Sequence, residues 1–144
     1  MPELPEAETI VRGLRPAIVG QTIRAIEIIH ADVLRQPRRR FADRVRGRTV
    51  MGVERRAKNV IIRVDEDLVV AVNLGMTGRL LPSLADGPGT PDSTHPAVRF
   101  RFEGGGALIF DDTRRFGTVE CLTGAEWRER SERMGPEPVV ASLT

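Results

Sequence analysis

The first residues of the chain, MPELPEAE, place a proline and several carboxylates where they could do chemistry. A free N-terminal amine has a pKa of about 7.7–8.0, whereas the pKa of a lysine side chain is about 10.4. At neutral pH a far larger fraction of the terminal amine is therefore unprotonated and nucleophilic. If Met1 is removed, Pro2 becomes a secondary amine that can condense with an aldehyde or a sugar C1 to give a charged iminium. Glu3, beside it, and Glu6, about one helical turn further on, are suited to general acid and base work.

The same residues also suit an ordinary helix start. Proline is tolerated in a first helical turn, and carboxylates there interact favourably with the helix dipole. Apolar residues then recur at helical spacing: Ile10, Val11, Leu14 and Ile18. This spacing predicts an N-terminal helix that Pro16 breaks or restarts and that Gly20 closes. From these residues alone, a catalytic and a purely structural interpretation of PELPE both stay open.

The basic residues are distributed unevenly. Residues 12–63 carry 14 basic side chains against four acidic ones, although the net charge is only +2. Such a surface favours a polyanion partner, and a solvated arginine-rich surface is the alternative. Of the 22 basic residues in the chain, 21 are arginine, and Lys58 is the single lysine. A compact, titratable amine at that position is a candidate for a specific role.

The elements that must position these groups are mostly strands. Short runs rich in β-branched residues are separated by turn sequences: TIRAIEII, RTVMGVE, NVIIRV, LVVAVNL, AVRFRFE, ALIFDD and GTVECL. In VRFRFE, apolar and charged residues alternate, which is typical of an antiparallel strand with one face in water. We therefore predict a mainly β fold with some α: an N-terminal helix, then an antiparallel β-sandwich of about seven to eight strands, with a barrel as the alternative. RRRFADRVRG and GAEWRERSERMG predict two short helices, and residues 84–94 a loop.

Length and composition limit the class of protein. A chain of 144 residues suits one domain, and neither a membrane-spanning apolar run nor a secretory signal is visible. We expect a cytoplasmic monomer without a bound cofactor or metal. The single cysteine, Cys121, excludes an internal disulfide and is expected to be buried and inert. The ending GPEPVVASLT is typical of a linker, so we expect residues 1–135 to form one domain and residues 136–144 to begin a connection to another segment.

Four motifs occur in an order that is specific although each is weak alone: PELPEAET at the start, RRAKN at 55–59, NLGMTG at 73–78 and DDTRRFGTV at 111–119. Together they resemble the N-terminal domain of formamidopyrimidine-DNA glycosylases over essentially the whole chain. The resemblance implies excision of oxidised purines, such as 8-oxoguanine and formamidopyrimidines, from duplex DNA, followed by strand cleavage at the abasic site. Leu4 favours this purine branch, because the sister group that acts on oxidised pyrimidines typically has PEGPE.

The resemblance also implies residue roles. Pro2 would be the Schiff-base nucleophile, Glu3 the acid that assists opening of the sugar, and Glu6 a supporting carboxylate. Lys58 matches a lysine that contacts the lesion nucleotide and donates a proton in β-elimination. Met76, Arg114 and Phe116 match a trio that fills the space left by an extruded base. His95 matches a DNA-contacting histidine, but the family usually has a second histidine two residues later, where this chain has Ala97.

Other interpretations remain. The family continues into a helix-two-turn-helix segment and a four-cysteine zinc finger, and neither is present here, so a structural zinc is implied only for that missing part. We therefore expect this polypeptide alone to bind damaged double-stranded DNA weakly and to be poorly active. A DNA-binding domain that has lost the chemistry, a member of the oxidised-pyrimidine branch and a tautomerase with a proline base are the alternatives.

Overall fold

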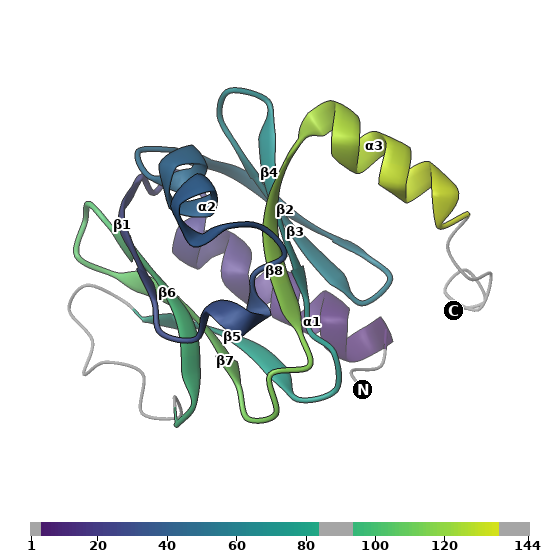
Figure 1. Cartoon of the computed structure of the whole chain (residues 1–144), viewed down its shortest axis with the longest axis horizontal. Coiled ribbons are helices and arrows are strands. Elements are labelled where there is room, and N and C mark those ends of the chain that lie inside the picture. Colours follow the sequence, from purple (N-terminus) through teal and green to yellow (C-terminus); the bar gives the residue numbers. More distant parts are fainter. Residues whose placement is uncertain (1–3, 84–93, 136–144) are drawn as a thin grey trace.

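The computed structural model describes residues 4–83 and 94–135, and for residues 4–8 the backbone alone. Its strands form two four-stranded sheets (Figure 1). In sheet order, the first consists of β1 (Ile23–Ile28), β6 (Pro96–Phe102), β7 (Ala107–Asp112) and β5 (Gly78–Ser83). The second consists of β2 (Val50–Arg56), β3 (Asn59–Val64), β4 (Leu68–Asn73) and β8 (Thr118–Thr123). All neighbouring strands are antiparallel, which confirms the predicted sandwich.

The core lies between the two sheets, where the alternating residues of the strands meet. On β6, Phe100 and Phe102 are buried as the alternation predicts, and Phe100 packs edge-on against Phe41 with ring centroids 6.1 Å apart. On the other face of β6, Arg99 and Arg101 both pair with Glu27 of β1. Period-two patterning therefore decides which face of this sheet is buried.

One strand was not predicted from the sequence. The segment GRLLPS forms β5, which lies at the edge of the first sheet and pairs only with β7. Proline cannot donate to a strand ladder, so Pro82 argues against a central strand but is compatible with an edge. No element was predicted for this segment, and its edge position is what allows a strand to contain Pro82.

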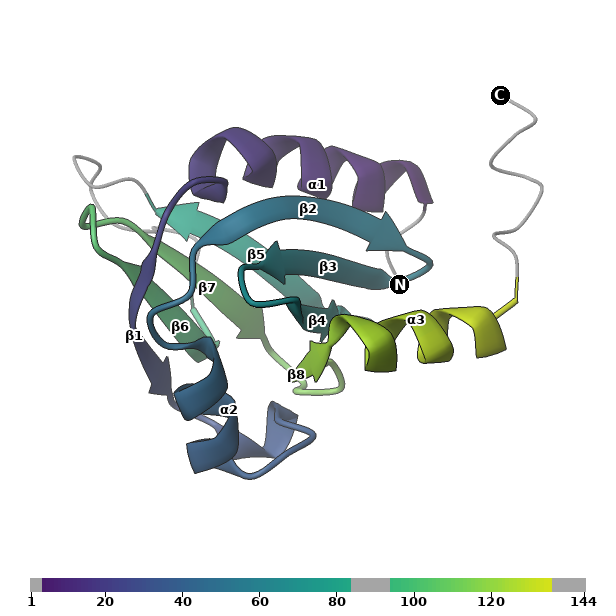
Figure 2. The same ribbon diagram turned by 90° about the horizontal axis from the view of Figure 1, so that it is seen from above.

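Helix α1 (Leu4–Ile18) packs against β2, and Figure 2 shows the two side by side. Its buried residues include Val11, Leu14 and Ile18, as the helical spacing predicts. The expectation that Pro16 breaks the helix was wrong, because the helix continues to Ile18. Pro16 lies in the last turn and is exposed. It removes one hydrogen bond to the preceding turn, and the helix persists because its apolar face is packed into the core. Gly20, with φ of +90°, ends the segment as expected.

Helix α2 (Arg38–Val45) packs against β1 and β8, and α3 (Gly124–Arg133) packs against the face of the second sheet that points away from the core, where Trp127 lies in a cluster with Ile61, Val69, Ala71 and Leu122. A short 3-10 helix, η1 (Ala31–Val33), precedes the predicted helix α2, whose Phe41 and Val45 are buried. Helix α3 buries Trp127, whereas Met134 is the C-cap and is 40% exposed. Cys121 on β8 is buried, and desolvation raises the pKa of its thiol to about 11, so it is an inert core residue. Within the described ranges, no helix is long and apolar enough to cross a membrane.

Candidate nucleic-acid interface and catalytic residues

The predicted catalytic residues belong to two segments, one of which is only partly described. Pro2 and Glu3 lie outside the described residues, and Glu6 lies in the first turns of α1, where only the backbone is described. Lys58 lies in the two-residue turn between β2 and β3, and its side chain is half-buried. In both ribbon views the N-terminal end of α1 lies next to this turn (Figures 1 and 2). The fold thus brings the start of α1 to the segment that carries the only lysine.

Hydrogen bonds connect the Lys58 turn to the loop between β4 and β5. The backbone N–H of Leu74 donates to the Lys58 carbonyl over 3.3 Å. The Asn73 amide donates to Asn59 Oδ1 over 3.2 Å, and its own oxygen accepts from the Gly75 N–H at 2.9 Å. The β4–β5 loop (residues 74–77) is therefore held at a fixed position relative to the turn that carries Lys58.

The predicted space-filling trio is exposed on two loops. Met76, on the β4–β5 loop, is 55% exposed, and Phe116, on the β7–β8 loop (residues 113–117), is 57% exposed. Arg114 lies on the same loop as Phe116, with its guanidinium carbon 4.8 Å from the centre of the ring. Two large apolar side chains left in water contribute little of the free energy that their burial would give to folding. Their exposure is what a surface that enters another molecule would show.

The two loops touch directly. A Cβ atom added to Gly75 would lie 2.9 Å from the backbone nitrogen of Gly117 and 3.0 Å from the carbonyl carbon of Phe116. A Cβ added to Gly117 would lie 2.5 Å from the backbone carbonyl oxygen of Asn73 and 2.8 Å from the Phe110 ring. Glycine is required at these positions because backbone passes against backbone. The sequence motifs NLGMTG and RRFGTV are thus neighbours in space.

Two buried carboxylates that sequence reasoning did not select organise this end of the sandwich. Asp111 and Asp112 end β7 and are 0% and 1% exposed. Asp112 accepts from the Thr77 hydroxyl, from the Gly117 N–H at 2.8 Å and from the Arg114 N–H at 3.3 Å. Two adjacent acidic residues at the end of an apolar strand were a visible signal, since buried carboxylates require partners. In the sequence, Asp111 and Asp112 contribute only to the motif DDTRRFGTV.

His95 is attached to the same strand end by its backbone. Its N–H donates to Asp111 Oδ2 over 2.9 Å, and its carbonyl accepts from the Asp112 N–H at 3.1 Å. The ring is exposed, with Nδ1 2.9 Å from the Thr94 hydroxyl oxygen. Ala97, at the position of the family's second histidine, is fully buried and so does not share the exposed surface of His95.

The two arginines of the β7–β8 loop have different surroundings. Arg115, with φ of +54°, donates to Asp32 of η1 over 2.8 Å, and this hydrogen bond holds the pKa of the Asp32 carboxyl below its usual value. Arg114 lies instead over Phe116. The ion pair of Arg115 therefore ties the loop to η1 and leaves Arg114 with its neighbouring aromatic ring.

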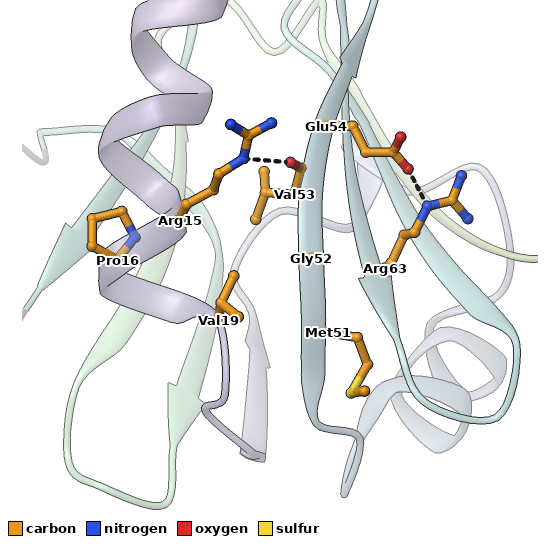
Figure 3. Close-up of a pocket in the computed structure, with 8 residues that line it drawn as sticks. All are labelled: Arg15, Pro16, Val19, Met51, Gly52, Val53, Glu54 and Arg63. Atoms are coloured by element: carbon orange, nitrogen blue, oxygen red, sulfur yellow. Dashed lines mark hydrogen bonds and ion pairs between the residues drawn. The ribbon is translucent and has the colours of Figure 1, made fainter.

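A hollow in the described structure lies elsewhere. It is an open depression of about 820 Å³ between α1 and β2, lined by Arg15, Val53 and Met51 among others (Figure 3). Arg15 Nε donates to the Val53 carbonyl over 3.0 Å across it. Of the predicted site residues whose side chains the structure describes, none lines it. In the same described part of the chain, no three His, Cys, Asp or Glu side chains are grouped to hold a metal ion.

Comparison with known proteins places this fold in one class, the DNA glycosylases. Residues 1–119 match the model of the formamidopyrimidine-DNA glycosylase N-terminal domain. The match covers most of the chain, so the chain belongs to this family, as its sequence motifs indicated.

Curated relatives and solved structures agree with this family assignment. A formamidopyrimidine-DNA glycosylase of Geobacillus kaustophilus is 41% identical over 143 residues, and one of Rhodopseudomonas palustris is 37% identical over 150, each alignment covering 96% of this chain and 51% of the relative. The Lactococcus lactis enzyme in complex with Fapy-dG-containing DNA superimposes with a TM-score of 0.81 at 30% identity, over 91% of this chain and 48% of that one. The same enzyme with abasic-site DNA gives a TM-score of 0.80. This chain spans about half the length of these relatives.

Proposed function

We propose that the chain is the catalytic N-terminal domain of a bifunctional DNA-repair enzyme that removes oxidised purines, such as 8-oxoguanine and formamidopyrimidines, from duplex DNA and then cleaves the strand. One observation carries the proposal. Exposed Met76, Arg114 and Phe116 lie on two loops in direct contact, and hydrogen bonds tie one of these loops to the turn of Lys58. Residues 1–135 would form this domain and residues 136–144 would begin the linker to the rest of a cytoplasmic, monomeric enzyme.

The loop side chains suit the physical problem of reaching a base inside a duplex. Extruding a nucleotide costs about a few kcal/mol in lost stacking and pairing, and the gap must be filled. Phe116 is a wedge that can part stacked base pairs, and Arg114 can pair with the base left without a partner. Met76 would occupy the vacated volume. His95, exposed at the same strand end, would contact the DNA backbone.

The chemistry would be carried by the segments that lie beside these loops. Pro2, once Met1 is removed, would attack the sugar C1′ of the damaged nucleotide, and the damaged base would leave as the C1′–N bond breaks. Opening of the sugar ring would then convert the adduct into a Schiff base. Glu3 would assist opening of the sugar ring, with Glu6 in support. Lys58 would donate a proton in the elimination that cleaves the strand. The arginine-rich first half of the chain supplies positive charge for the phosphates.

Borohydride reduction of the Schiff base on a duplex with a single 8-oxoguanine tests the proposal. We expect a covalent adduct from a chimera in which residues 1–135 replace the matching half of the Geobacillus kaustophilus relative, and none from its Pro2→Gly variant. Glu3→Gln should abolish base release in the same chimera. Unchanged base release in these variants would show that the catalytic assignment is wrong, and adducts with oxidised pyrimidines alone would place the chain in the sister branch.

The isolated 144-residue chain should give only a weak adduct in the same assay, because it lacks a second domain to grip the DNA. Mass measurement of its N-terminus accompanies the assay, since retained Met1 would leave Pro2 without a free amine. A strong adduct from the isolated chain would contradict the expected dependence on a second domain.

A further inference from the structure

We propose that Thr77 and Asp112 form a positioning pair that makes the β4–β5 and β7–β8 loops move as one unit, so that Met76 and Phe116 keep a fixed spacing when they enter DNA. The contribution to DNA binding rests on the proposed function. The mechanical coupling of the loops does not, because it is a property of the free protein.

The Asp112 carboxylate accepts hydrogen bonds from both loops, and Oδ1 is the oxygen that joins them. Oδ1 accepts from the Thr77 hydroxyl on the β4–β5 loop and from the Arg114 N–H, 3.3 Å away, on the β7–β8 loop. Oδ2 accepts from the Gly117 N–H at 2.8 Å. The Thr77 oxygen also lies 3.4 Å from the Arg114 nitrogen and can accept from it. Thr77 therefore contacts the opposite loop directly as well as through the carboxylate.

Each of these contacts is next to a side chain that would enter the DNA. Thr77 follows Met76, Gly117 follows Phe116, and Arg114 is itself one of the three. Asp112 is 1% exposed, so its hydrogen bonds form away from water. Bonds to an ionised acceptor in such a place are stronger than neutral ones, and a donor left without its acceptor there is costly. A shift of one loop alone would break at least one of them.

A purely local role for Thr77 would predict something different. Its loss would then lower stability and loosen its own loop, but would leave the amides of the opposite loop protected. Positioning predicts that removing a hydroxyl from the β4–β5 loop frees amides of the β7–β8 loop. Replacement of Thr77 by serine keeps the hydroxyl and should preserve the coupling.

Amide hydrogen exchange of the free chain, followed by NMR, separates the two roles. We expect Thr77→Val to speed exchange at Arg114 and Gly117 by about tenfold beyond any change in global stability, and Thr77→Ser to restore the slow rates. Thr49→Val is the matched control, because its hydroxyl pairs with that of Thr22, 2.8 Å away, between residues outside both loops. Rates at Arg114 and Gly117 that follow global stability alone in Thr77→Val would overturn the proposal.

A double-mutant cycle tests the consequence for DNA. Met76→Ala and Phe116→Ala, each and together, are measured for binding to a duplex with an abasic-site analogue. With Thr77 present, the fold-loss of DNA affinity in the double variant should differ from the product of the two single fold-losses by about fivefold. In the Thr77→Val background, the fold-loss of the double variant should equal that product. Losses that already multiply with Thr77 present would refute the coupling in DNA binding. The cycle is measured in the chimera that carries residues 1–135. If that chimera does not prefer the abasic-site duplex over undamaged DNA, the proposed function fails, and the exchange rates of the free chain alone decide whether the loops are coupled.

Discussion

Gly75 and Gly117 face each other across two loops, so closely that a Cβ on Gly75 would lie 2.9 Å from the Gly117 nitrogen. Gly75 also has φ of +57°, a conformation that other residues adopt at a cost. The contact makes neighbours of two motifs that are more than thirty residues apart in the sequence. Any side chain at Gly75 must push the loops apart.

We therefore expect Gly75→Ala to lower the free energy of unfolding by about 1–3 kcal/mol, through left-handed backbone strain and the clash with the opposite loop. Urea denaturation followed by circular dichroism measures it. Gly13→Ala is the matched control, because a Cβ there has nothing within 4 Å. Gly13 lies in an exposed helical position, so this control should gain about 0.5–1 kcal/mol. A neutral Gly75→Ala would show that the loops separate at little cost.

Thr123→Ala should destabilise the protein by about 1 kcal/mol, because it removes the capping box of α3. The Thr123 hydroxyl accepts from the Glu126 N–H at 3.1 Å, and the Glu126 carboxylate accepts from the Thr123 N–H at 2.8 Å. Thermal denaturation measures the loss. Thr113→Ala, at an exposed loop position, should leave the melting temperature unchanged, and an equal effect of both variants would exclude capping as the cause.

Cys121 should resist thiol reagents in the folded protein. Burial raises the pKa of its thiol to about 11, so at pH 8 only about one molecule in a thousand carries the thiolate. Labelling with a disulfide reagent should be slow in buffer and complete in denaturant. Rapid labelling under native conditions would mean that β8 opens locally.

Glu27 should contribute a small, pH-dependent stabilisation. Its hydrogen bond with Arg101, then that with Arg99, lowers the pKa of the carboxyl from its ordinary value of 4.5. A carboxyl whose pKa is lowered by folding stabilises the folded state above its ordinary pKa, and this stabilisation disappears as the pH falls through the lowered value. The pair is partly exposed, so Glu27→Gln should cost less than about 1 kcal/mol at pH 7 and nothing at pH 2.

Urea titrations across this pH range check the prediction. Glu103→Gln is the control, an exposed carboxylate for which the described structure gives no ion pair. A cost of Glu27→Gln that does not change with pH would show that packing of the side chain, and not its charge, is responsible.

The strands and helices could largely be predicted because their cause is local. Alternation identified β6, and helical spacing identified the buried face of α1. Where the sequence misled, tertiary position was responsible. Pro82 is compatible with a strand because β5 is an edge, and Pro16 lies in a helix because the packing of Val11, Leu14 and Ile18 in the core outweighs the hydrogen bond that it removes.

The sequence by itself determined the family, through four motifs in order, and with it the candidate residues from Pro2 to Phe116. Whether these residues contact DNA stays a prediction. Only the tertiary structure decided that Met76 and Phe116 occupy touching loops, and that Asp112 and Thr77 link those loops. The physical reason is that the period of apolar side chains shows only which face of one helix or strand is buried. Contacts between the loops depend instead on the pairing of β5 with β7 and of β4 with β8, and no local sequence pattern encodes this pairing.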